Sequence, residues 1–324
     1  MLRRTAALGA ALLALLWTAA ITRAADYPAR PVTIVLGFPP GGASDILGRI
    51  IANKLAAVLG QPFVIDDRPG AGGNVAGEVV AHAAPDGYTL LLGNNSILAT
   101  NASLYKTIGF DAEKDFAPIC LIGTQANVLV VNKDLPAHSL AELIALAKAK
   151  PGKLNYASSG YGLAAHLAGE LFKAEAHVDI VHVPYKGSAP ALQDVIAGHD
   201  QMMFATTSGA MGFIASGQVR PLAVTTLRRT AALPDIATID ELAIKGFDAT
   251  TWHGLVAPAG TPQDIIDKLN RATVEALHDP DVRKSLEGLG VDIAGSSPAE
   301  FAAYIKAEIP KWAAVIKASG AKLE

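Results

Sequence analysis

The feature that most limits the fold of this chain is a repeated unit of strand, short glycine-rich loop and helix. An apolar run at 32–38 leads through the loop 39–45 into a helical pattern. The run 63–66 leads through a second loop, 69–74, into another helix, and a third strand is expected at 88–93. This alternation is typical of a doubly wound, mostly parallel sheet that is flanked by helices. We therefore predict an α/β fold.

The alternation of strands and helices starts again near residue 126. Helical patterns separate five further strands, at 126–131, 154–157, 178–183, 202–205 and 221–225. After a strand at 251–258, the chain ends in three helices, expected at about 262–277, 280–289 and 298–317. The length of 324 residues is that of two ordinary domains.

The helical tail indicates how the two domains divide the chain. Helices that follow a complete second α/β block suggest that the chain crosses back and finishes on the first domain. We place domain 1 at 26–123 and 228–324, and domain 2 at 124–227. The two crossings would be hinge strands, and the ligand cleft would lie between the domains.

The first 24 residues resemble a signal peptide. Arg3 and Arg4 precede an uncharged, Ala- and Leu-rich run from Ala6 to Ile21, and small residues flank a cleavage site after Ala24. The run is short for a membrane-spanning helix, although a retained anchor is an alternative. We expect a soluble, periplasmic product.

Charge and cysteine content exclude several classes of protein. The 27 Lys and Arg against 30 Asp and Glu leave no basic surplus for a nucleic-acid backbone, so no nucleic-acid partner is expected. An apolar content of 51% argues against a disordered chain. Because Cys120 is the single cysteine, the chain can form neither an internal disulfide nor a multi-cysteine zinc site.

The glycine-rich loops 39–45, 69–74 and 158–162 predict an anion site. Glycines allow backbone N–H groups to point into a cavity, and each following helix adds a positive N-terminal end. Hydrogen-bonding side chains lie at the same level of the sheets, namely Ser44, Asn74, Ser96, Ser158, Ser159 and Thr206. Neither a P-loop nor a dinucleotide fingerprint occurs, so a carboxylate is the favoured anion. Ordinary βα turns are the alternative.

Catalytic signatures are weak. The chain has no nucleophile elbow and no zinc-protease motif, so no cofactor, metal or catalytic residue is expected. A secreted serine hydrolase that uses Ser159 or Ser208 with His166 remains an alternative, without a motif for the third member. His166 lies close enough to the loop 158–162 to reach a ligand, whereas His253 is expected to be structural. For Asp45, a helix cap is favoured over a ligand contact.

Six sequence strings in a fixed order carry a resemblance to a known family. They are YPxRPV at 27–32, PGGxSD at 40–45, DRPGAGGN at 67–74, PDGYTL at 85–90, VPYKG at 183–187 and WxGLxAPxGTP at 252–262. On these strings the chain resembles the Bug family, the extracytoplasmic solute receptors of tripartite tricarboxylate transporters. The resemblance covers almost all of the mature chain.

The resemblance implies a two-domain periplasmic-binding-protein (Venus-flytrap) fold that closes on a small carboxylate. It implies ligand contacts from Phe38, Gly41, Gly42, Ala43, Ser44, Asp45, Gly73, Asn74 and Ser96 in domain 1, and from Ser158, Ser159, Gly160, Gly162, His166, Tyr185, Gly187 and Thr206 in domain 2. Ala43 stands where relatives often carry Gly or another small residue, and Ser44 where they often carry Thr. A large and a small integral membrane subunit would be the partners, and we expect a monomer.

Two further readings and the ligand stay open. The same fold could present its closed form to a signalling sensor, and it could serve as the effector half of a transcription regulator if a DNA-binding segment preceded it. Dicarboxylates, tricarboxylates, acidic amino acids and aromatic acids would all suit amide-lined loops. Because Arg68 and Lys186 are the few cations near the loops, a densely charged tricarboxylate is disfavoured.

Overall fold

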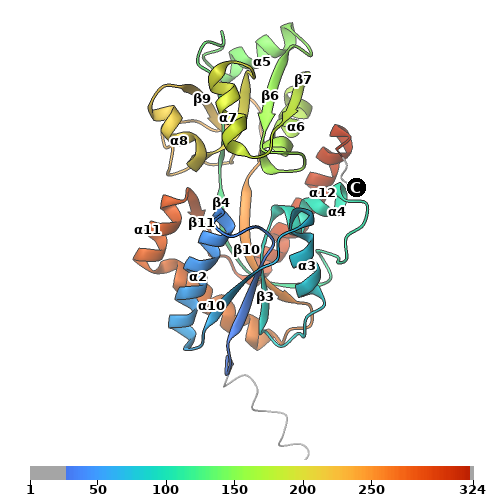
Figure 1. Ribbon diagram of the computed structural model, residues 1–324, viewed down its shortest axis with the longest axis vertical. Helices are drawn as coiled ribbons and strands as arrows, with labels where there is room; N and C mark the ends of the chain where they lie inside the picture. Colours follow the sequence, from blue (N-terminus) through green and yellow to red (C-terminus); the bar gives the residue numbers. More distant parts are fainter. Residues whose placement is uncertain (1–26, 322–324) are drawn as a thin grey trace, which may run out of the picture.

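Two β-sheets, each flanked by helices, form two lobes stacked along the long axis of the molecule (Figure 1). The computed structural model describes residues 27–321, and the predicted signal peptide at 1–24 lies outside them. The strand order is β11-β4-β10-β3-β1-β2 in the six-stranded sheet of lobe 1 and β7-β6-β8-β5-β9 in the five-stranded sheet of lobe 2.

The sheet of lobe 1 is mixed. β1 (Val32–Leu36) lies parallel to β2 (Phe63–Asp67) and β3 (Thr89–Asn94). β10 (Thr251–Pro258) runs antiparallel to β3, and β4 (Phe116–Gln125) and β11 (Val291–Ile293) extend this antiparallel half. The parallel half thus contains the predicted βαβαβ unit, and the returning chain adds the antiparallel strand β10 beside it.

The sheet of lobe 2 is mixed in the same way. The strands β6 (Leu154–Ser158), β7 (Ile180–Pro184) and β8 (Met202–Thr206) are parallel. β5 (Asn127–Asn132) runs antiparallel to both β8 and β9 (Val219–Val224). The predicted two-lobed α/β fold is confirmed, but the sheets are mixed rather than mostly parallel.

The helices follow the predicted order along the chain. Lobe 1 carries α2 (Ala43–Leu59), α3 (Asn74–Ala81), α10 (Gln263–His278), α11 (Pro280–Gly288) and α12 (Pro298–Ser319). Lobe 2 carries α5 (Leu140–Ala149), α6 (Ala164–Ala176), α7 (Ser188–Ala197) and α8 (Thr207–Ala215). Gly60 adopts φ 73° at the end of α2, which is the helix stop expected there.

Several elements were not predicted from the sequence. They are the ten-residue strand β4, the short strand β11, a π-helical segment at Ser96–Thr100, and the helices α4 (Asn101–Leu104) and α9 (Ile239–Leu242). β4 contains Pro118 and has register shifts against β10, so its sequence lacks a clean strand pattern. The other segments are too short to show a period.

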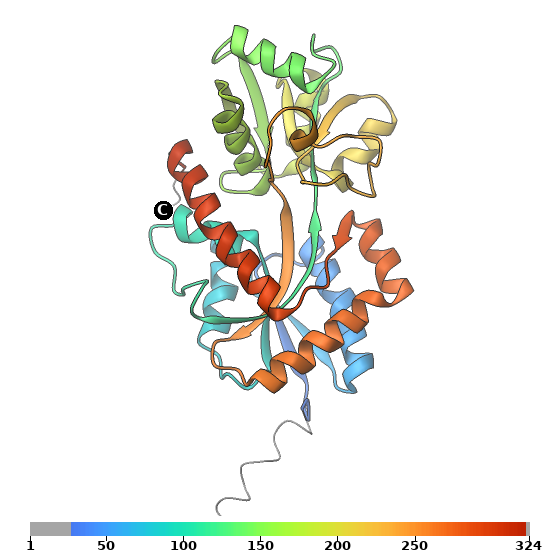
Figure 2. The same ribbon diagram turned by 180° about the vertical axis from the view of Figure 1, so that it is seen from behind.

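Two crossings connect the lobes. β4 continues almost directly into β5, and the second crossing is the segment that leads from β9 into β10 (Figure 2). Within that segment α9 packs against α5 and β9, and Phe247 contacts the lobe 2 residue Phe172. We therefore propose that the second domain boundary lies near Thr250 rather than at 228.

α12 links the two lobes along one side of the molecule. Figure 2 shows it running diagonally from the middle of lobe 1 towards lobe 2, and it contacts both β4 and α6. The buried carboxylate of Glu308 accepts hydrogen bonds from the indole N–H groups of Trp252 on β10 (3.0 Å) and Trp312 on α12 (2.8 Å). This contact ties α12 to a strand that leads out of the second crossing.

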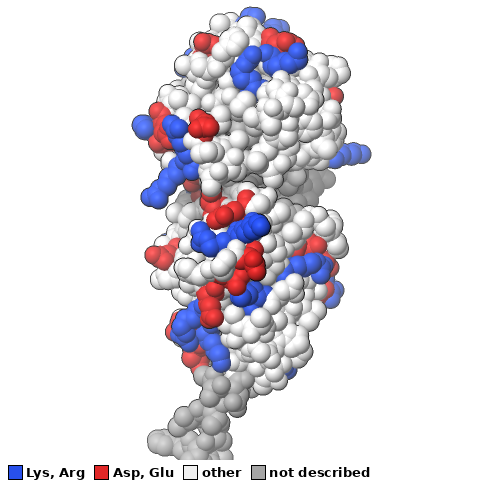
Figure 3. Space-filling view, turned by 90° about the vertical axis from the view of Figure 1, so that its left-hand side faces the viewer, with Lys and Arg blue, Asp and Glu red and all other residues white. Residues whose placement is uncertain are grey.

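Charged side chains of both signs are mixed on the face shown in Figure 3. Ion pairs contribute to this pattern, such as Lys54 on α2 with Asp279 next to α11, and Arg68 with Asp66. Within residues 27–321, no helix is both long and apolar enough to span a membrane.

Candidate ligand-binding site

A cavity of about 650 Å³ lies between the two lobes and is lined by loops from both. Lobe 1 contributes Phe38, Pro39, Pro40, Gly41, Gly42 and Ser44, and lobe 2 contributes Ser159, Leu163, Gly187 and Ser188. None of these ten residues carries a charge. The structure therefore brings together six predicted residues, namely Phe38, Gly41, Gly42, Ser44, Ser159 and Gly187.

The lobe 1 wall is the N-terminal end of α2. Its N-cap is Gly42, which offers no side-chain cap, and the first backbone bond of the helix is Ile46 N–H to Gly42 O (3.0 Å). Asp45 is therefore not the N-cap that its sequence position suggested. Its carboxylate accepts the Gly41 N–H (2.8 Å) and pairs with Arg49 (2.7 Å), so it holds the loop rather than facing the cavity.

The Ser44 side chain connects this wall to the antiparallel half of the sheet. Its Oγ lies 2.8 Å from Nε2 of His253, a residue of β10. His253 is only 4% exposed, and burial lowers its pKa to about 4, so the ring is neutral near pH 7. The expected structural role of His253 thus includes a direct contact with a residue that lines the cavity.

Three predicted residues lie behind this wall. A Cβ on Gly73 would come within 2.6 Å of Ile97, and one on Gly37 within 2.7 Å of Gly73, so the two glycine loops pack backbone against backbone. Asn74 accepts a hydrogen bond from Asn101 Nδ2 (2.7 Å). Ser96 is buried at the start of the π-helical segment. None of the three lines the cavity itself.

The lobe 2 wall consists of two loops bonded to each other. Tyr185 N–H donates to Ser158 O (3.0 Å), and Gly187 N–H donates to Ser159 O (3.1 Å). The Tyr185 hydroxyl lies within 2.6 Å of carboxylate oxygens of both Asp194 and Asp200. Tyr185 therefore anchors its loop to the C-terminal end of α7 and does not direct its hydroxyl into the cavity.

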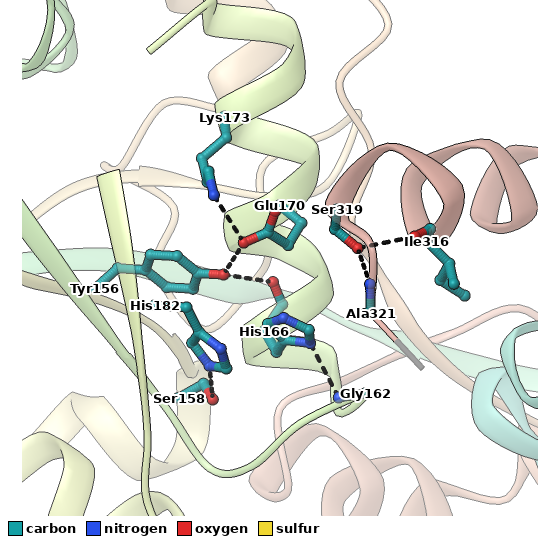
Figure 4. Close-up of polar contacts among 10 residues, drawn as sticks. All are labelled: Tyr156, Ser158, Gly162, His166, Glu170, Lys173, His182, Ile316, Ser319 and Ala321. Carbon is teal, nitrogen blue, oxygen red and sulfur yellow. Dashed lines mark hydrogen bonds and ion pairs between the residues drawn. The ribbon is translucent and has the colours of Figure 1, made fainter. Parts of the chain in front are cut away.

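Ser158 and His166 lie beneath the lobe 2 wall (Figure 4). Ser158 Oγ contacts Nε2 of His182 (2.6 Å), and His166 Nδ1 accepts the Gly162 N–H (3.0 Å). The only hydrogen bond that the described chain gives the His166 ring is therefore to a backbone amide. The hydrolase alternative, which required a hydroxyl of Ser159 or Ser208 on this ring, finds no such contact.

Gly160 and Thr206 of lobe 2 are not among the residues that line the cavity. Gly160 adopts φ 143° in the loop 158–162. In lobe 1, Ala43 is the first residue of α2. Thr206 is the exposed N-cap of α8 and does not line the cavity. Sequence reasoning did not name four residues that line the cavity, namely Pro39, Pro40, Leu163 and Ser188. All four lie in or next to predicted loops, a position from which they could have been found. It also missed His182, which nothing in the sequence marks.

A two-lobed α/β fold with an uncharged cavity between its lobes defines a solute-binding protein. The family model described as "Tripartite tricarboxylate transporter family receptor" matches residues 47–321. The chain belongs to this family, and it is an extracytoplasmic solute-binding receptor. The family resemblance stated from the sequence strings is thereby confirmed.

The chain is similar to relatives and to solved structures over most of its length. It is 38% identical to Protein BugT of Bordetella pertussis, over 94% of each chain. An R. palustris protein solved with adipate is 39% identical with a TM-score of 0.77, over 91% of this chain and 99% of its own. MatC from Rhodopseudomonas palustris, solved with bound malate, is 33% identical with a TM-score of 0.74, over 90% and 100%.

Proposed function

We propose that this receptor captures a small carboxylate with an apolar body and passes it to an integral membrane transporter. The observation that carries the proposal is a single cavity whose opposite walls, one from each lobe, are uncharged and glycine-rich. Phe38, Gly41, Gly42, Ser44, Ser159 and Gly187 are the predicted site residues that we propose as ligand contacts, with Leu163 and Ser188 added.

Two helices begin at this cavity from opposite sides. α2 has Gly42 as its N-cap and α7 has Gly187, and neither N-cap has a side-chain hydrogen bond. The first amides of a helix have no partner within the helix and carry positive partial charge, so both ends attract an anion. A carboxylate fits this environment without a lysine or arginine.

The rest of the lining sets the chemistry of the ligand body. Phe38, Pro39, Pro40 and Leu163 offer apolar surface between the two helix ends. Arg68, one of the two cations near the loops, is paired with Asp66 (3.0 Å). Since buried negative charges without counter-charges are costly, a tricarboxylate is disfavoured. Adipate and malate, which occupy the two neighbouring structures, are each small carboxylates.

Capture works through closure of the lobes about the two crossings. An open form admits the carboxylate to the α2 end, and rotation of lobe 2 then covers it. The ligand shifts this equilibrium only by binding the closed form more tightly than the open one. The receptor acts in the periplasm, after removal of the signal peptide near Ala24. There the large and small membrane subunits recognise its closed form.

A thermal-shift screen tests this function. The mature protein is heated with a panel of mono-, di- and tricarboxylates, each beside its own amide. A ligand at about 100 times its Kd stabilises the folded state by about 2.7 kcal/mol, which raises the melting temperature clearly. We expect a carboxylate with an apolar body to raise it and its amide not to. If only neutral compounds raised it, carboxylate capture would be refuted.

A further inference from the structure

The lobe 2 wall rests on a pair of stacked histidines that the proposed ligand contacts do not include. The rings of His166 on α6 and His182 on β7 lie 4.1 Å apart, centroid to centroid, and nearly parallel at 24°. Each ring is hydrogen-bonded to the loop 158–162, at opposite ends, and Figure 4 shows this loop below the two rings. We infer that His166 and His182, as neutral imidazoles, are positioning residues for ligand binding that hold this loop, and that protonation of His166 releases it.

His166 fixes the far end of the loop. Its Nδ1 accepts the Gly162 N–H, so the proton of the neutral ring is on Nε2. An imidazolium has no acceptor nitrogen, and protonation of Nδ1 would break this bond. His166 is 2% exposed, so its charged form would be poorly solvated.

His182 fixes the near end through Ser158. Ser158 Oγ accepts the Gly160 N–H (3.2 Å), donates to Gly160 O (3.2 Å) and lies 2.6 Å from His182 Nε2. All three contacts are satisfied if Nε2 carries the proton and donates to Oγ. The other nitrogen, Nδ1, then carries no proton, and it is buried without a hydrogen-bond partner among residues 27–321. A proton placed there would be a buried charge stacked against His166.

The groups around the pair favour neutral rings. The charge of Glu170 favours a proton on His182, but this carboxylate already accepts from the Tyr156 hydroxyl (2.5 Å) and from Lys173 (3.3 Å). Lys173 opposes a positive charge on either ring, and the Tyr161 ring packs edge-to-face with both histidines. Burial is the largest cause that lowers the pKa of both histidines, to about 4.

The loop that the histidines hold is part of the cavity wall. Ser159 lines the cavity, and its carbonyl accepts the Gly187 N–H, so a shift of this loop also moves the start of α7. The inference rests on the proposed function, because the wall matters for affinity only if the ligand binds between these loops.

Hydrogen exchange and binding on matched variants test the inference. H166N places an amide oxygen near the position of Nδ1 and cannot titrate, whereas H166L removes the acceptor. At about pH 7 we expect H166L to speed amide exchange in residues 158–163 and to weaken adipate binding about five- to tenfold, the loss of one hydrogen bond. H166N should restore both. S158A and H182L should loosen the Gly160 end in the same way, whereas H182Q should retain that end because its amide can contact Ser158 Oγ.

The pH profile separates positioning from mere packing. When the pH is lowered from about 7 to about 4, wild type should lose more exchange protection in residues 158–163, and more adipate affinity, than H166N does. The titration of adipate itself is common to both proteins, so it does not affect this comparison. Parallel profiles for wild type and H166N, or unchanged exchange in H166L, would overturn the inference.

The two proposals fail in different ways. If adipate does not bind, the strongest carboxylate of the thermal-shift screen replaces it. Exchange that follows the expected pattern without any carboxylate binding would support the histidine role while refuting the proposed function. If H166L and S158A bind a carboxylate as tightly as wild type does, the proposed function would be supported and the histidine role refuted.

Discussion

At the scale of single residues, the site depends on side chains that hold its loops rather than on side chains that face the ligand. Asp45 is the clearest case, since its carboxylate accepts the Gly41 N–H and pairs with Arg49. The nearby Asp67 has a raised pKa, caused first by burial and then by the charge of Asp45. The Asp45 carboxylate therefore bonds to the loop amide and also opposes a negative charge on Asp67.

We expect D45A to weaken carboxylate binding about tenfold, because the Gly41 N–H loses its partner and the loop 39–42 loosens. D45N is the matched control, since it keeps an acceptor oxygen and loses only the charge. Calorimetric titration with the best ligand of the screen measures both. Equal affinity of D45A and wild type would show that the loop keeps its shape without Asp45.

Buried histidines predict acid sensitivity. His166 and His253 are neutral when folded, with pKa values of about 4, whereas an exposed histidine has a pKa of about 6.5. Below about pH 6.5 these histidines bind a proton in the unfolded chain but not in the folded chain. The free energy of unfolding therefore falls as the pH is lowered to about 4, by up to about 3 kcal/mol per histidine. Urea unfolding at a series of pH values measures this loss.

H253Q is the control for that pH dependence. Its amide nitrogen can contact Ser44 in place of the imidazole Nε2, and it does not titrate. The loss of stability between about pH 6.5 and about pH 4 should be smaller in H253Q than in wild type. An identical loss of stability in both proteins would mean that folding does not lower the pKa of His253.

At the scale of elements, the contact between α12 and β10 stands out, because it places a carboxylate among buried aromatic rings. Glu308 accepts from both indoles and pairs with Lys311, which lies 3.6 Å from Asp248 on the second crossing. The ring of Trp252 also packs edge-on against Phe301 and Tyr304 of α12. This cluster fixes the strand that carries His253.

We expect E308L to destabilise the protein by about 3–5 kcal/mol, because two buried indole N–H groups and Lys311 lose their acceptor. E308Q keeps one acceptor oxygen and should cost less. Of the three tryptophans, Trp17 lies in the predicted signal peptide, so mature fluorescence comes from Trp252 and Trp312 alone. Urea unfolding followed by this emission measures both variants, and equal stability of E308L and wild type would contradict the expectation.

At the scale of the whole molecule, the proposed closure is a rotation of two lobes about two crossings. One buried apolar cluster includes Leu91 of lobe 1, Phe204 of lobe 2 and Trp252 beside the crossing. A core that continues from lobe to lobe restricts the lobes to small relative movements, because packed interiors resist deformation.

We expect a saturating carboxylate to lower the radius of gyration of the mature protein, since lobe 2 rotates over the ligand. Small-angle X-ray scattering with and without the ligand measures this change, and the amide of the same ligand is the control. An unchanged radius with bound carboxylate would show that capture does not involve closure.

The order of strands and helices and the position of the glycine loops were predictable from the sequence. A buried strand such as 32–36 and an amphipathic helix such as 43–59 have periodic patterns that neighbouring residues carry by themselves. Glycines at the strand ends mark the loops in the same local way, and so Phe38, Gly42 and Ser159 could be placed near the cavity. β4 lacked such a pattern and was missed.

Only the tertiary structure decided which way the side chains of the site point. Asp45, Tyr185 and His166 were named as candidate site residues, and the structure shows that each holds a loop that lines the cavity. The partner of Ser44 is His253, which is 209 residues away along the chain. Such partners meet only because β10 lies antiparallel beside β3, and no local pattern of residues predicts this pairing of strands.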